Sequence, residues 1–221
     1  MRRSTFLVLT ISLAGVAADA SVSAQNKHGD AYAIDEEETL LYVQAYKKNG
    51  TLGSSFAHNH VVVAEQTRGT VRFDPDHPKA CKFSLDIPVR HLVVDRPSAR
   101  RRVGFEPVDV GRGTRAKIRE SMLSSGQLDP KDFPVIRFRA SNCERHGKGY
   151  RVRARLRIRG QTTTVVFPAA IAVDGDKLTA RGHFRIRHRD VGMEPYSAFL
   201  GAVKVAQPLD FTGHIVAHRT H

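Results

Sequence analysis

The sequence predicts an all-β protein, a closed antiparallel barrel of about eight strands with a long insertion that contains one short helix. Charged and apolar residues alternate strictly along residues 150–159, which is the pattern of a strand with one wet face. Runs of this kind recur along the chain and are separated by turn sequences rich in Gly, Asn, Asp and Pro. The alternation is lost over a long stretch only between His91 and Pro134, which marks the insertion. A pair of open sheets packed face to face is the alternative, because alternation does not reveal closure.

The N-terminus predicts export. Arg2 and Arg3 precede an apolar run from Phe6 to Ala18, and small residues follow at positions 22–24. The apolar run is too short to span a bilayer, which needs about 20 residues. We therefore expect a signal peptide at residues 1–24, a mobile segment at 25–30 and one barrel domain at 31–221, in a periplasmic or secreted protein.

Four strand-like runs precede the insertion. They are Tyr32–Asp35 with Thr39–Tyr46 as one long strand, Phe56–Val63, Gly69–Asp74 and Ala80–Arg90. Asn49-Gly50 predicts a hairpin between the first two, and residues 74–78 predict a turn before the last.

The insertion contains two features. Arg96–Arg102 is expected to form a cationic loop that contains a proline. Thr114–Leu123 is expected to form the short helix, with Ile118 and Met122 one turn apart. Because the insertion has few apolar residues, it would bury them best by covering one open end of the barrel.

The remaining strands complete the barrel. They are Val135–Ser141, Arg151–Phe167 with a reversal at residues 160–162, Ile171–Val173, Lys177–His188 and Leu209–Ala217. Asp174-Gly175 predicts a hairpin turn, and the final strand is expected to close against the first.

The two cysteines, Cys81 and Cys143, could form a disulfide in an exported protein. Strand parity favours two separate thiols instead. Cys81 lies on the same side as Phe83, whereas Cys143 is out of phase with Ile136 and Phe138 unless the strand bulges near residues 141–142.

One face of the expected strands is apolar throughout. Its members are Phe73, Phe83, Leu85, Ile87, Ile136, Phe138, Leu156, Ile158, Phe167, Phe184 and Ile186. Periodicity alone favours a filled core for this set, and leaves a ligand pocket as the alternative.

Five motifs resemble, in order, those of the YceI-like family of secreted bacterial lipocalin-like barrels. They are YAID at residues 32–35, GTVRFD at 69–74, LDIPV at 85–89, LDPKDFPVIRF at 128–138 and LRIRGQTTTVVF at 156–167. FRIRHRDVGM at 184–193 fits less well, because His188 stands where the family has arginine and Val191 where it has phenylalanine.

The resemblance implies that the apolar set lines a cavity that holds a polyisoprenoid chain. At about 0.8 kcal/mol per buried CH₂, one five-carbon unit contributes up to roughly 4 kcal/mol. The expected partner is an isoprenoid or quinone-like lipid, and no other cofactor is expected.

His58 and His60 are the main polar feature. At positions i and i+2 of a strand they project from one face and could offer two nitrogens to a metal ion. They could also contact the polar head of a lipid, or simply pack at the barrel mouth. A histidine-dependent metal-handling protein is therefore an alternative function.

The formal charge is +13, and +12 without residues 1–24. In an exported protein this charge favours an anionic membrane surface over nucleic acid, and an envelope stress protein without bound lipid is a further alternative. The common nucleophile, nucleotide and metalloprotease motifs are absent from the sequence, so no catalytic residue and no enzyme is predicted. The oligomeric state does not follow from the sequence.

Overall fold

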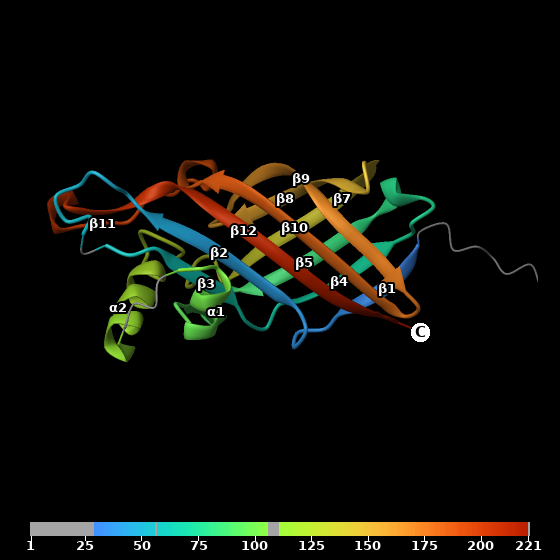
Figure 1. The fold of residues 1–221 in the computed structure, drawn as a ribbon, viewed down its shortest axis with the longest axis horizontal. Helices are drawn as coiled ribbons and strands as arrows, with labels where there is room; N and C mark the ends of the chain where they lie inside the picture. The colour runs from blue at the N-terminus through green and yellow to red at the C-terminus, as the bar shows by residue number, and fades with distance from the viewer. Residues whose placement is uncertain (1–28, 56, 106–110, 221) are drawn as a thin grey trace, which may run out of the picture.

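A computed structural model describes residues 29–55, 57–105 and 111–220 (Figure 1). The predicted signal peptide, part of the mobile segment 25–30 and the start of the expected strand at Phe56 lie outside these residues. The strands are β1 Asp30–Ile34, β2 Leu40–Lys47, β3 His60–Ala64, β4 Arg68–Phe73, β5 Lys82–Pro88, β6 Leu92–Val94, β7 Val135–His146, β8 Gly149–Ile158, β9 Gln161–Asp174, β10 Lys177–Arg187, β11 Ser197–Ala198 and β12 Val203–Arg219. The helices are α1 Pro97–Arg102 and α2 Arg112–Met122, with short 3₁₀ turns η1 Pro78–Ala80, η2 Val89–His91, η3 His188–Val191 and η4 Phe199–Gly201.

The strands close into an antiparallel barrel with eight wall positions. Strand β12 pairs with β10 along one edge, and with β2 and then β1 along the other. β1 pairs with β4 and β2 with β3, while β4 pairs with β5 and β3 with β6. Three wall positions therefore consist of two strand segments each, and β7, β8, β9, β10 and β12 supply the other five. The predicted barrel is confirmed, and the open sandwich is excluded.

Strand β8 shows how the sequence produces this wall. Its residues alternate between exposed arginines and buried apolar side chains. The reversal after β8 has Arg159 and Gly160 at φ 48° and 75°, the left-handed conformation that a two-residue hairpin turn requires. The alternating burial of β8 and the left-handed turn residues both favour a hairpin, which is the structure that the sequence predicts here.

Several predicted boundaries are wrong. Strand β9 runs unbroken from Gln161 to Asp174 through Pro168, whose register partner is Arg151 of β8. The connection between β2 and β3 is a long excursion around Asn49-Gly50, not a tight hairpin, and β12 begins at Val203 rather than Leu209.

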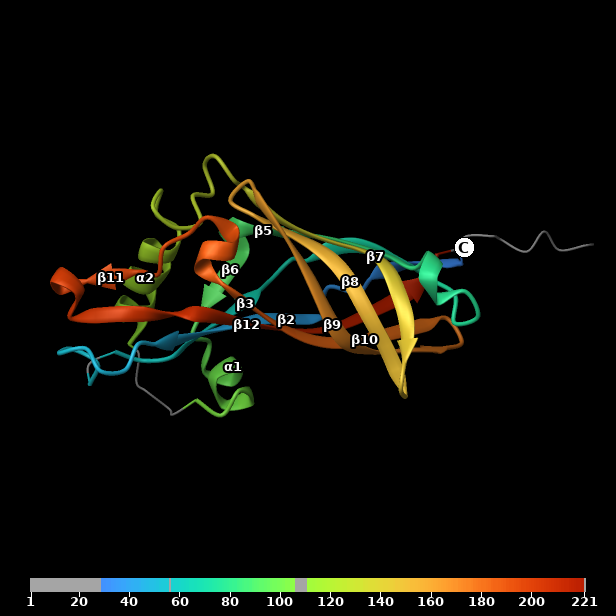
Figure 2. The same cartoon turned by 90° about the horizontal axis from the view of Figure 1, so that it is seen from above.

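The described part of the insertion contains two helices instead of one. The expected cationic loop is helix α1, which begins at Pro97, where a fixed φ and a missing N–H suit a first helical residue. Ala99 of α1 packs with Val61 and Val63, which face outward from β3. Helix α2 lies where the helix was predicted and sits at one end of the barrel (Figure 2). Only α2 therefore meets the expectation that the insertion covers an open end.

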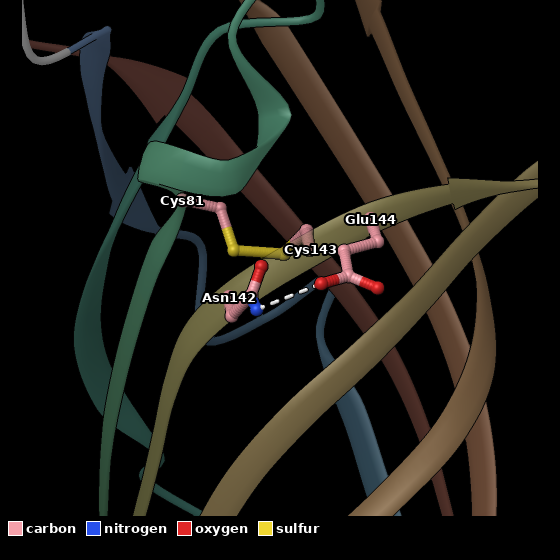
Figure 3. Close-up of a disulfide and its surroundings, with 4 residues drawn as sticks. All are labelled: Cys81, Asn142, Cys143 and Glu144. Carbon is pink, nitrogen blue, oxygen red and sulfur yellow. Dashed lines mark hydrogen bonds between the residues drawn. A yellow bond between two sulfur atoms is a disulfide. The ribbon is translucent and has the colours of Figure 1, made fainter.

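A disulfide joins Cys81 to Cys143, so the predicted pair of separate thiols is wrong (Figure 3). The Cα atoms are 5.9 Å apart, and both residues are fully buried. The register of β7 against β8 shifts between Ala140 and Asn142, which leaves Ser141 as one extra residue. This bulge brings Cys143 back to the inward phase, opposite Val152.

Candidate functional site

The barrel contains a cavity of about 510 Å³ that is lined mainly by apolar side chains. Its lining continues to Ile118 and Met122 of α2, to the β2–β3 connection at Ala57 and to Phe199 of η4. These elements gather at one end of the barrel, hereafter the helix-bearing end (Figures 1 and 2). Phe199 is largely exposed, so the cavity opens to solvent at this end.

Most of the predicted ligand-binding residues line this cavity. They are Phe83, Leu85, Ile87, Ile136, Phe138, Leu156, Ile158, Phe167 and Phe184. Phe73 and Ile186 are buried in the core but do not line the cavity. Phe73 instead makes an edge-to-face contact with Tyr150, with ring centroids 5.3 Å apart. The structure therefore brings nine of the eleven side chains to one surface.

Four phenylalanines form a continuous aromatic patch on the cavity wall. Phe184 stacks on Phe211 with centroids 5.0 Å apart, and also contacts Phe138 and Phe167. Gly182 allows this packing, because a Cβ there would lie 2.6 Å from the Phe167 ring. The sequence prediction missed Phe211, although it shares the parity of Leu209 and Ile215 on the last strand.

The cavity mouth carries several polar and basic side chains. Lys47, His58, Lys117 and Lys204 line it beside His60. Partial burial is the main cause that lowers the pKa of His58, and the neighbouring His60 and Arg100 side chains lower it further. A neutral His58 can accept a hydrogen bond from a ligand.

Asp95 holds His60 in place at this mouth. The Asp95 carboxylate lies 2.6 Å from His60 Nδ1 and accepts hydrogen bonds from the Val61 amide at 3.0 Å and from Arg100 at 2.9 Å. Burial raises the pKa of Asp95, but the bonds and charges of His60, Val61 and Arg100 outweigh it and lower that pKa. Because Asp95 is ionised, His60 donates through Nδ1 and keeps Nε2 for another partner.

His188 also lines the cavity and is itself buried. Its Nδ1 lies 2.9 Å from the Gln207 carbonyl and donates to it. Burial lowers the pKa of His188 despite this bond, so the ring is neutral near pH 7. The segment that follows forms a turn, since the Asp190 carboxylate accepts a hydrogen bond from the Arg187 amide and Gly192 is in the left-handed conformation.

His58 and His60 have no third metal ligand within the described ranges. The one suitable group of three in that part of the chain is Asp35, Glu38 and His218, with ligand atoms within 4.8 Å of one another. Its acids already have partners, because Asp35 accepts from two backbone amides and Glu38 pairs with Lys177. The metal-handling hypothesis therefore gains no support from the geometry. None of the described helices combines the length and apolar character needed to cross a bilayer.

The closed barrel with a one-ended apolar cavity defines a lipocalin-like binding barrel. The solved structures that share the fold include a BcnA protein and a YCEI protein. Burkholderia cenocepacia BcnA matches with a TM-score of 0.61 and 18% identity, over 83% of this chain and 99% of that one. A Campylobacter jejuni YCEI protein matches with a TM-score of 0.54 and 12% identity, over 72% and 85%. No curated protein matches the sequence.

The model of the YceI-like domain matches residues 32–217, nearly all of the described chain. The protein therefore belongs to the YceI-like family. Family membership and the cavity together support a barrel-type protein that binds a lipid or isoprenoid.

Proposed function

We propose that this protein is a periplasmic or secreted carrier of a long isoprenoid lipid, of the quinone or polyprenyl type, and that it performs no catalytic step. The observation that carries the proposal is the apolar cavity of about 510 Å³, which is open at one end. Cavities of roughly 300–1,000 Å³ are typical of small-molecule sites. The apolar chain would lie along the phenylalanine patch inside the barrel.

The energetics favour binding by burial alone. Each five-carbon unit contributes up to roughly 4 kcal/mol at about 0.8 kcal/mol per CH₂. A micromolar complex needs about 8 kcal/mol, so a few buried units suffice even after the cost of ordering the chain. Affinity therefore does not require a polar contact, whereas selection among lipids does.

The polar head of the lipid is placed at the mouth in this proposal. His60 has Nε2 available there because Asp95 holds Nδ1, and His58 lies two residues away. The free Nε2 of His60 can accept a hydrogen bond from a hydroxyl of the lipid head, because Nδ1 carries the proton that is donated to Asp95. A neutral His58 can donate or accept. A quinone carbonyl therefore fits His58, a quinol hydroxyl fits His60, and a phosphate fits the lysines beside them.

The test begins with protein purified without detergent, whose organic extract is analysed by mass spectrometry. An isoprenoid lipid in molar proportion to the protein supports the proposal. Delipidated protein should then take up a quinone and release it to a competing polyprenyl lipid. Extracts and uptake assays that show no lipid would refute the carrier.

A matched pair of variants connects uptake to the cavity. Ala169 lines the cavity on β9, and its neighbour Ala170 points outward on the same strand. Ala169→Phe should reduce lipid uptake about tenfold, because a ring would occupy space that the chain needs. Ala170→Phe should leave uptake unchanged, and circular dichroism checks that both variants are folded.

A further inference from the structure

Exposed large apolar side chains gather at the cavity mouth. Leu52, Phe199 and Leu200 are 99%, 81% and 110% exposed, and Tyr196 is 40% exposed. Elsewhere in the described chain, Val166 on the outer wall of β9 is the only other large apolar residue of this kind. Large apolar groups clustered in water mark an interaction surface.

Two loops carry these side chains, and they are joined. The Gly53 amide donates to the Ala202 carbonyl at 2.9 Å, and the Lys48 amide donates to the Lys204 carbonyl at 2.8 Å. Both loops extend beyond the barrel at the helix-bearing end (Figures 1 and 2). Residues 48–55 and 196–204 therefore form one structural unit, hereafter the rim.

The backbone of the rim holds its apolar side chains outward. Phe199 and Leu200 have φ values of 51° and 50°, in the left-handed region that bulky residues rarely adopt. Two successive residues in this conformation store strain, and no burial of their side chains offsets it. This arrangement is explained if the side chains have an apolar partner outside the chain.

The rim is continuous with the cavity and stands in a basic setting. Tyr196, Phe199 and Lys204 line the cavity from the rim, and Lys117 of α2 lines it as well. Helix α2 contains four basic residues and one acidic residue, Glu120. Apolar tips among lysines and arginines are complementary to an anionic phospholipid surface.

We propose that the rim docks on the surface of an anionic phospholipid bilayer, where Leu52, Phe199 and Leu200 insert among the headgroups and the cavity mouth faces the membrane. Docking of the rim on a membrane does not depend on which molecule the cavity binds. The idea that lipid enters through it rests on the carrier function proposed above. Loading would then need no passage of the lipid tail through water.

Tryptophan fluorescence tests the docking directly, because the chain contains no Trp. Phe199→Trp places the single reporter on the rim, and Val166→Trp places it at the exposed position on the barrel wall. With vesicles of phosphatidylethanolamine and phosphatidylglycerol, the emission of the rim reporter should shift to the blue. The wall reporter should not shift, and neither should the rim reporter with phosphatidylcholine alone. Equal emission changes for both reporters, or none for the rim, would overturn the proposal.

A second comparison measures affinity by vesicle sedimentation. Leu52→Ser with Leu200→Ser changes two exposed rim residues that lie outside the cavity lining, and should weaken binding to the anionic vesicles at least about tenfold, whereas Val166→Ser should not. Added salt should weaken the binding of the wild type. Unchanged binding of the double variant would overturn the proposal. Concentration-dependent dimerisation abolished by the double substitution, without vesicle binding, would assign the rim to a second copy instead.

Lipid uptake from dilute ethanol separates this proposal from the carrier function. The Ser double variant should take up lipid from ethanol as the wild type does, but should extract it from vesicles more slowly. A wild type that docks yet never holds lipid would refute the carrier and leave the docking intact. A wild type that loads from ethanol but does not bind vesicles would refute the docking alone.

Discussion

Loss of the Cys81–Cys143 disulfide should cost about 4 kcal/mol of unfolding free energy. The bridge closes a loop with a sequence separation of 62 residues. On the chain-entropy model such a loop lowers the entropy of the unfolded chain enough to give about 4 kcal/mol at 25 °C. With an m value of about 2 kcal/mol/M in urea, the unfolding midpoint should fall by about 2 M.

The assay is urea unfolding followed by circular dichroism for three samples: oxidised wild type, reduced wild type, and Cys81→Ala with Cys143→Ala. Both sulfur atoms belong to fully buried residues, so the variant also loses packing that the reduced protein keeps. The reduced protein isolates the effect of the cross-link. A midpoint equal to that of the oxidised protein would refute the reasoning. Lipid uptake should persist in all three samples while they are folded, because the cavity opens at the other end.

Two further predictions concern buried charge. Asp95→Asn should lower the unfolding free energy by about 3–5 kcal/mol, because it removes a buried carboxylate that pairs with Arg100 and His60. Asp86→Asn should lower it by under about 1 kcal/mol, because the ion pair of Asp86 with Arg139 is half exposed. Urea unfolding compares the two variants, and similar losses would contradict this assignment. The free energy of unfolding should also fall in acid, because burial lowers the pKa of His188 in the folded protein. The neutral ring stabilises the folded state fully above pH about 6.5, the ordinary pKa of histidine. This stabilisation is lost as the pH falls through the lowered pKa. His188→Gln should flatten the decrease in melting temperature between about pH 7 and pH 5, and an unchanged slope would count against the burial argument.

Much of the fold followed from the sequence, because alternation and turn chemistry act locally. The β8–β9 hairpin combines a strict period of two with Gly160 at a left-handed turn position. The continuation of β9 through Pro168 did not follow, because a proline normally marks a strand edge and only the register shows that it is tolerated here. The disulfide was missed because one extra residue, Ser141, reverses the parity of everything after it. A bulge leaves no periodic signal of its own.

The cavity wall was largely predictable, and its mouth was not. Inward apolar residues occupy alternate positions along each strand, and this alternation is visible in the sequence. Nine of the eleven residues selected in this way line the cavity. The mouth depends on contacts between segments far apart in sequence. Asp95 reaches back 35 residues to His60, and the rim joins Gly53 to Ala202. Neither pair has a spacing that local pattern can detect.

The two ends of the barrel differ in their contacts: one end has stabilising contacts, and the other end has the cavity mouth. At one end β12 pairs with β1, the disulfide ties β7 to the segment before β5, and Phe73 packs against Tyr150. At the other end β11, η4 and the β2–β3 connection extend past the ring, and their apolar side chains face outward. A barrel with a cavity gives up the packing energy of its centre. Closure and cross-linking at the end away from the mouth offset this loss without narrowing the entrance. The disulfide and the cavity are therefore connected through stability. The contacts at the closed end compensate for the packing that the cavity lacks, and the opposite end can keep an open mouth with exposed apolar side chains.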